Sequence, residues 1–229
     1  MHSPVLTCYY NTMIKILKIL LDFIYNRSCY FCNNSREDTV FCQKCYKSVE
    51  FLPFRHYSFI GKNKLYSASC YDGIVKKLIR AVKFHNKTEL ADFQAKLMYD
   101  YWESIGESER EYTVVPVPMF FSKARKRKYN HMDLVGEKFC ELTGYKLNKT
   151  SLIRNRETQP QFKLSVKERE KNLKDAFSVV DKNIKEPVLL IDDISTTGTT
   201  LKEIIKALNS NNIYDITCFV TSIADRKSN

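Results

Sequence analysis

The chain has 229 residues, of which 44% are hydrophobic and 13% aromatic. This composition excludes wholesale disorder and allows one sizeable domain plus a small module. The 37 Lys and Arg residues outnumber 26 Asp and Glu residues, which gives a formal net charge of +11. Such an excess favours anionic partners such as phosphates, nucleic acid or acidic lipid, although a background of solvated lysines accounts for it equally well.

The cysteines are not distributed like a secreted disulfide scaffold. Four of the eight form two CxxC pairs, and the other four, Cys8, Cys70, Cys140 and Cys218, are scattered, some within apolar runs. Cysteines in apolar runs behave as small core hydrophobes. We therefore expect a reducing compartment and a cytoplasmic protein.

The apolar stretch Met13–Tyr25 predicts an amphipathic helix, because its charged residues are spaced by three and four. It is too short and too charged to span a membrane, and no small-residue cleavage site follows it. A docking surface is the favoured interpretation and a membrane anchor the alternative. Either Met1 or Met13 is compatible with being the first translated residue.

A four-cysteine cluster follows this stretch. Two CxxC turns are separated by nine residues, and their thiols are Cys29, Cys32, Cys42 and Cys45. Two such turns can supply four thiolates in tetrahedral geometry, which predicts a structural zinc site. Disulfides are the alternative, and an iron–sulfur cluster would need a different spacing. The interleaved aromatic residues either pack under the metal or stack on single-stranded bases.

Three zones are expected: a helix and zinc module over residues 13–50, a linker over 51–64, and an α/β domain over 65–229. In the last zone short apolar runs alternate with amphipathic helices, which is typical of a parallel sheet with helices on both faces. The expected strands are Leu65–Tyr71, Tyr112–Pro118, Pro187–Asp192 and Ile216–Ile223. The expected helices are Ile74–Val82 behind an Asp72 cap, Thr88–Ile105, His131–Leu142 ending at Gly144, and Thr199–Leu208.

The segment Val188–Ile204, VLLIDDISTTGTTLKEI, carries the strongest chemical signal. Ligands of open parallel sheets sit beyond the carboxyl ends of the strands, where Asp192 and Asp193 lie. The following hydroxyl-rich loop opens a helix, whose free N–H groups favour a phosphate. Carboxylates beside a phosphate site are suited to sugar hydroxyls or hydrated magnesium. A capped helix after a strand, with an incidental Asp-Asp pair, is the alternative.

The run VLLIDDISTTGTT resembles the signature of type I phosphoribosyltransferases, which bind phosphoribosyl pyrophosphate (PRPP). The resemblance implies that Asp192 and Asp193 are the catalytic pair, holding the ribose hydroxyls with Mg²⁺ present. It also implies that the loop holds the 5′-phosphate. The loop positions implied to bind PRPP are Ser195, Thr196, Thr197, Gly198, Thr199 and Thr200.

Two further segments are rich in candidate anion ligands. The prolines of the Pro116–Pro118 turn fix the backbone where a strand ends, and a basic run follows over 123–128. A weakly periodic segment beginning near Arg154 suits a mobile flap over an anionic ligand. The candidate pyrophosphate and flap residues are Pro116, Val117, Pro118, Arg127, Asn130, Arg154, Arg156, Gln161 and Arg169. For the basic run, a solvated helix start or a nucleic-acid patch is the alternative.

These stretches, with the cysteine cluster, resemble the ComF competence-protein family over about residues 25–225. Shared features are the PVP turn, the Arg127–His131 motif and the R-x-R-x-T segment from Arg154. Lys128 and His131 depart from the family's usual glycine and glutamine, which puts the geometry and contacts of that loop in doubt.

Two functional hypotheses follow from the resemblance. The first is a PRPP-binding phosphoribosyltransferase acting on an unidentified acceptor, with departing pyrophosphate stabilised electrostatically. The second is a non-catalytic competence factor that binds single-stranded DNA and uses the fold for nucleic-acid binding or PRPP sensing. The family implies a role in DNA uptake and natural transformation, with DNA-uptake proteins as partners. This inference rests on analogy, because a fold does not fix a function.

Overall fold

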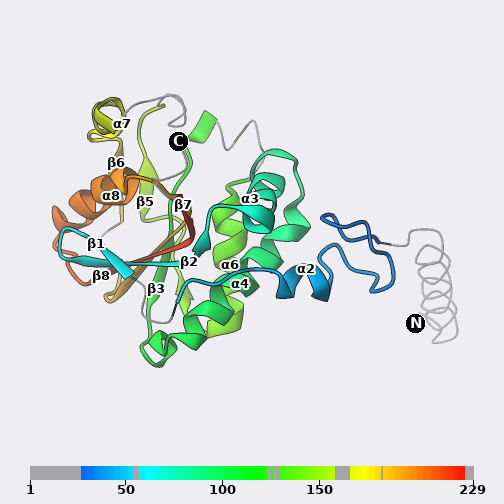
Figure 1. Ribbon diagram of the computed structural model, residues 1–229. Helices are drawn as coiled ribbons and strands as arrows, with labels where there is room; N and C mark the ends of the chain where they lie inside the picture. The colour runs from blue at the N-terminus through cyan, green and yellow to red at the C-terminus, as the bar shows by residue number, and fades with distance from the viewer. Residues whose placement is uncertain are drawn as a thin grey trace, which may run out of the picture. The chain divides into compact units, whose positions relative to one another are not determined.

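The computed structural model describes residues 27–53, 57–122, 125, 129–157, 166–181 and 183–224 (Figure 1). The apolar stretch Met13–Tyr25 lies outside them, so its predicted helix stays a prediction. Within the described ranges, no helix is long and apolar enough to cross a membrane. The chain divides into two compact units, Met1–Lys47 and Ser48–Asn229, and each is described by itself.

The larger unit is built on a six-stranded sheet with the order β1-β2-β8-β7-β3-β4. All its neighbouring pairs are parallel except the antiparallel pair β1–β2. Its strands are β1 (Tyr57–Ile60), β2 (Asn63–Cys70), β3 (Thr113–Pro116), β4 (Lys146–Leu147), β7 (Val188–Ser195) and β8 (Ile216–Ile223). A separate antiparallel pair consists of β5 (Leu152–Arg154) and β6 (Phe177–Val179).

The α-helices are α2 (Gln43–Lys47), α3 (Gly73–Phe84), α4 (Ala91–Ser104), α6 (His131–Thr143), α7 (Val166–Leu173) and α8 (Thr199–Asn209). Helices α3, α4, α6 and α8 correspond to the helices expected from the sequence, whereas α2 and α7 were not predicted. Helix α6 ends at Gly144, whose φ of 77° is the left-handed conformation that glycine adopts without strain. Asp72 precedes α3 as expected, but its side chain makes no capping hydrogen bond. The predicted α/β class, with a mostly parallel sheet flanked by helices, is confirmed.

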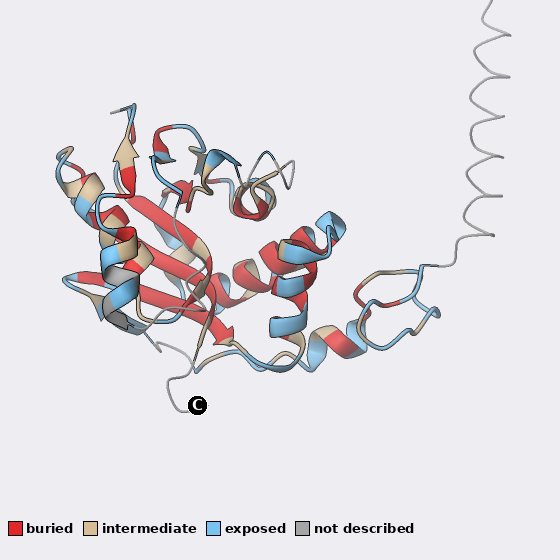
Figure 2. Ribbon diagram, turned by 90° about the horizontal axis from the view of Figure 1, so that it is seen from above, coloured by how far each residue is buried: buried red, intermediate tan, exposed pale blue. Residues whose placement is uncertain are grey.

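The sheet separates two apolar layers, and Figure 2 shows its central strands buried along most of their length. On one face, residues of α8 pack with Val188 and Leu190 of β7. On the other, α4 and α6 contribute an aromatic cluster in which the rings of Trp102 and Phe219 lie 4.8 Å apart. Burying each large apolar side chain contributes about 1.5–3 kcal/mol, so these layers hold β7 firmly in the centre of the fold.

Strand β1 lies within the 51–64 segment, in which the sequence shows no clear periodicity. It forms a hairpin with β2, in which Ile60 pairs with Asn63 across the turn at Gly61 and Lys62. Gly61 has a φ of 61°, the backbone conformation that a two-residue hairpin turn requires. Three of the four β1 residues are exposed, so the strand has no buried face for a sequence pattern to reveal.

Candidate functional site

Strand β7 carries Asp192 and Asp193 near its carboxyl end, on opposite faces of the sheet. Side chains alternate along a strand, so Asp192 shares a face with Leu190, which packs in the α8 layer. Asp193 shares the other face with Ile191, whose Cδ1 lies beside Gly136 of α6. The two adjacent carboxylates therefore have different surroundings.

Asp193 is buried, with 3% of its surface exposed, and lies in a charged cluster. Its Oδ2 accepts hydrogen bonds from Lys83 Nζ at 2.6 Å and His131 Nε2 at 2.8 Å. Burial alone would raise the pKa of this carboxyl, but the charge of Lys83 and the contact with His131 lower it well below its usual range. Asp193 is thus an ionised carboxylate with strong partners inside the protein.

Asp192 is half-buried, and its Oδ1 accepts the backbone N–H of Asp193 at 2.8 Å. Burial and the charge of Asp193 raise the pKa of Asp192, and the charge of Lys83 opposes them only in part. Arg154 is close enough for the charge of Asp192 to raise its pKa, against the larger lowering effect of burial. The ionised form of Asp192 is therefore less well stabilised than that of Asp193, and a nearby cation would favour it.

The hydroxyl-rich loop connects β7 to the start of α8. Ser195 and Thr199 are buried, Thr197 and Thr200 are half-buried, and Thr196 is exposed. The hydroxyls of Thr197 and Thr199 lie 2.7 Å apart. Gly198 has a φ of 71°, and α8 has no acidic residue in its first turn. A helix N-terminus that offers hydroxyl groups and has no carboxylate in its first turn is suited to binding an anion.

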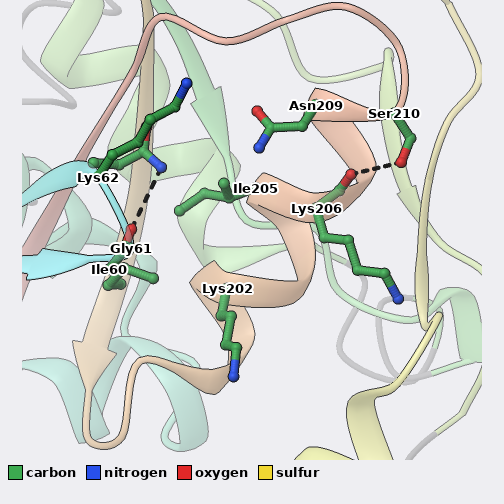
Figure 3. Close-up of a pocket in the computed structure, with 9 residues that line it drawn as sticks. Ile60, Gly61, Lys62, Lys202, Ile205, Lys206, Asn209 and Ser210 are labelled. Atoms are coloured by element: carbon green, nitrogen blue, oxygen red, sulfur yellow. Dashed lines mark hydrogen bonds between the residues drawn. The ribbon is translucent and has the colours of Figure 1, made fainter.

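The β1–β2 hairpin flanks this loop. A Cβ on Gly198 would lie 3.2 Å from Cδ1 of Ile60, so the hairpin lies against the glycine. Between the hairpin turn and α8 is an open hollow of about 580 Å³ (Figure 3). A second hollow of about 340 Å³ lies near Tyr112 and Tyr214. The residues lining these two hollows do not include the loop over 192–200.

The proline turn lies next to β7. Pro116 ends β3 beside Ile191, and the backbone N–H of Val117 donates to the Ile191 carbonyl at 2.9 Å. Asn130 links this turn to α6: its Nδ2 donates to the carbonyl of Val117 at 3.3 Å, and its Oδ1 accepts the N–H of Met132 at 3.3 Å. The turn is thus fixed in place, with Asn130 as the cap of α6. Pro118 is half-buried, and Arg127 lies outside the described residues.

The predicted flap residues are placed in different ways. Arg154 is half-buried on β5, with its guanidinium 5.4 Å from the centre of the Phe177 ring. Arg156 donates from Nη2 to the carbonyls of Asn172 and Lys174 at 3.2 and 2.7 Å. It thus supplies hydrogen-bond donors to backbone carbonyls at the C-terminal end of α7. Gln161 lies outside the described residues, and Arg169 is described only as part of the α7 backbone.

In the smaller unit, the four predicted metal ligands come together. The sulfur atoms of Cys29, Cys32, Cys42 and Cys45 all lie within 4.8 Å of one another. Cys32 and Cys42 Sγ are 3.6 Å apart, and the Cys42 N–H points at Cys29 Sγ at 3.5 Å. Burial opposes ionisation of Cys29, but the N–H of Cys42 and other backbone donors lower the pKa of its thiol to about 7.

The spacing of the four sulfurs fits a zinc ion. Tetrahedral Zn–S bonds of about 2.3 Å separate ligand sulfurs by roughly 3.8 Å, close to the distances in the cluster. Phe41, which is 3% exposed, packs against the rings of Phe31 and Tyr46 at 4.7 and 5.7 Å. These aromatic residues thus form the small apolar base of the cluster, while Tyr30 stays exposed.

Lys83 and His131 are functional candidates that sequence reasoning did not assign to the site. In the sequence, His131 is notable only as a departure from the ComF motif, and Lys83 directly follows the predicted helix Ile74–Val82. Lys83 lies 110 positions before its partner Asp193. A lysine in the last turn of a helix is so common that only the folded chain reveals this one's partner.

Comparison with known proteins gives a consistent group of relatives. No family model matches the chain. Competence protein F of Haemophilus influenzae is 27% identical over 201 residues, which cover 76% of this chain and 86% of that protein. The DNA utilization protein YhgH of Salmonella typhimurium is 28% identical over 151 residues, 65% of this chain and 66% of that protein. YhgH of Escherichia coli K12 is 25% identical over the same length. These relatives bear out the predicted ComF resemblance, and the chain is a homologue of competence protein F and of the YhgH DNA utilization proteins.

Proposed function

We propose that the chain binds PRPP together with Mg²⁺ at the carboxyl end of β7, and that it acts in DNA uptake and natural transformation. The observation that carries the binding proposal is the position of Asp192, which is not fully buried, near a hydroxyl-rich helix start with no acidic residue in its first turn. The competence and DNA-utilization names of the relatives support the cellular role.

In this proposal the loop and Asp192 divide the ligand between them. The N–H groups at the start of α8 and the hydroxyls of Thr197 and Thr200 face the 5′-phosphate. Asp192 accepts hydrogen bonds from the ribose hydroxyls and supplies a carboxylate near hydrated Mg²⁺. Magnesium commonly keeps several waters and takes one or two carboxylates plus substrate phosphates, so one carboxylate suits it. Mg²⁺ would neutralise part of the pyrophosphate charge when bound.

The proline turn and Arg154 complete the site. Val117 is fixed to β7 through the Ile191 carbonyl, so the turn presents a rigid backbone edge toward pyrophosphate. Arg154 lies within electrostatic range of Asp192 and offers a cation on the same side of the sheet. Transfer to an acceptor breaks the bond between the anomeric carbon and pyrophosphate, and the acceptor's lone pair forms the new bond.

Thermal unfolding tests the binding proposal. We expect PRPP with Mg²⁺ to raise the Tm of the full chain, because a ligand at 100 times its Kd adds about 2.7 kcal/mol of stability. Asp192→Asn should abolish this rise, while the exposed Asp215→Asn, a carboxylate remote from the loop, should retain it. No rise at millimolar ligand in the unmodified protein would refute PRPP binding. Pyrophosphate release in the same samples separates turnover from binding alone.

A second function, binding of single-stranded DNA, is favoured by the hollow beside α8. Its nine lining residues include Lys62, Lys202 and Lys206 and no carboxylate (Figure 3). A basic groove without carboxylates suits a flexible, negatively charged phosphate backbone. The basic run predicted for this role lies largely outside the described residues.

Salt-dependent binding to an oligonucleotide tests this second function. Each phosphate contact contributes about −0.7 to the slope of log K against log salt for single strands. Replacing Lys62 and Lys202 with Ala should reduce that slope by roughly 1.4, whereas Lys138→Ala on α6 should leave it unchanged. An unchanged slope in the variant without Lys62 and Lys202 would place the DNA elsewhere on the protein.

A further inference from the structure

The two acids of the Asp-Asp pair differ in exposure, in the face of the sheet that they occupy and in their hydrogen-bond partners. Asp193 is 3% exposed and faces α3 and α6, whereas Asp192 is half-buried on the face that packs with α8. Lys83 Nζ and His131 Nε2 both contact the same atom, Asp193 Oδ2. An ionised carboxylate only accepts hydrogen bonds, so the His131 ring donates through its Nε2–H.

The partners of Asp193 leave its carboxylate little capacity to bind a ligand. The negative charge of Asp193 is met by Lys83, whose side chain is 27% exposed, and by the donor of His131, whose side chain is 7% exposed. A magnesium ion or sugar hydroxyl would have to displace one of these partners to reach Asp193 Oδ2. Removing one partner of a buried pair is costly, because it leaves the other charge uncompensated.

The cluster joins three elements at the edge of the sheet where the candidate ligand site lies. Lys83 belongs to the last turn of α3, His131 is the first residue of α6, and Asp193 lies on β7. Tyr129 reinforces the junction, since its hydroxyl donates to the carbonyl of Val82 at 2.9 Å. Through Asn130, the same start of α6 holds the carbonyl of Val117 in the proline turn.

We propose that Asp193, Lys83 and His131 form a positioning unit that fixes the carboxyl end of β7 between α3 and α6, and that Asp192 is the only acid of the pair that contacts the ligand. The inference rests on the proposed PRPP site and assigns different roles to two residues that the sequence motif treats as equivalent. It makes His131, which replaces the glutamine usual in the ComF motif, a structural donor.

A matched pair of variants, Asp192→Asn and Asp193→Asn, tests the proposal in the full zinc-loaded chain. Calorimetric titration with PRPP and Mg²⁺ at neutral pH is combined with thermal unfolding without ligand. We expect Asp192→Asn to lose about 100-fold or more in affinity with little change in Tm. Asp193→Asn should lower the Tm by on the order of 5 °C and affinity by less than about tenfold.

Substitutions of His131 separate positioning from simple damage to the fold. Gln can donate an amide N–H to Asp193, so His131→Gln should retain more affinity and a higher Tm than His131→Ala. Equal and complete loss of affinity in Asp192→Asn and Asp193→Asn, with unchanged Tm, would show that Asp193 contacts the ligand and would overturn the proposal. If the unmodified protein does not bind PRPP, the proposed function fails, and an unchanged Tm in Asp193→Asn would separately refute the positioning role.

Discussion

Gly198→Ala is the substitution that probes the loop most cleanly. The φ of Gly198 is 71°, and in this left-handed region an L-residue costs about 1–2 kcal/mol. The new Cβ would also lie 3.2 Å from Ile60 Cδ1, the flexible end of a side chain that can shift by a few tenths of an ångström. The backbone cost therefore dominates. A loss of about 1–2 kcal/mol corresponds to a Tm lower by about 2–8 °C in a domain of this size.

Gly144→Ala is the matched control for this measurement. Gly144 has a similar φ of 77°, but a Cβ there meets no atom within 4 Å, and it ends α6. Thermal unfolding should therefore show comparable losses for both variants, while titration with PRPP and Mg²⁺ should show weaker binding only for Gly198→Ala. If Gly198→Ala is as stable as the unmodified protein, or if both variants bind equally well, the geometry assigned to the loop is wrong.

Three further predictions concern the metal cluster, the packing behind the proline turn and acid stability. Metal analysis should find about one zinc per chain, lost in Cys45→Ser and retained in Cys140→Ser; equal content in both would exclude the four-cysteine site. Gly136→Ala should lower the Tm slightly, because the new Cβ would lie 3.0 Å from Pro116 Cγ. The cost of overpacking, about 1–3 kcal/mol, exceeds the gain in helix propensity of about 1 kcal/mol. A higher Tm would show that space for the methyl group exists beside Gly136. The pKa of Asp193 is lower in the folded than in the unfolded chain, so its stabilisation is present above the ordinary aspartate pKa and is lost on acidification. In urea unfolding, the stability gap between the unmodified protein and Asp193→Asn should therefore narrow from pH 6 to pH 3; a constant gap would contradict the ionised cluster.

The elements that were predicted well are those with a buried face. The apolar runs of β7 and β8 and the helical spacing of α3 and α8 appear in the structure within a few residues of the expected bounds. These patterns are visible because burial forces apolar residues into the period of the element. Strand β1 was not predicted, since its residues are exposed and its position depends on pairing with β2.

Parts of the candidate site could not be inferred from residue type alone. A charged or polar side chain can bind a ligand or form hydrogen bonds with backbone groups, and the sequence does not distinguish these two roles. Arg156 and Asn130, expected near pyrophosphate, donate to backbone carbonyls at the end of α7 and in the proline turn. The opposite faces of Asp192 and Asp193 do follow from strand alternation, provided that β7 extends through both residues.

Isothermal titration of the full zinc-loaded chain with PRPP and Mg²⁺ at neutral pH tests the central claim most directly. We expect one saturable site per chain, with an affinity that depends on Mg²⁺ and on the carboxylate of Asp192. The absence of saturable binding at millimolar PRPP, or binding of equal strength in Asp192→Asn, would contradict it.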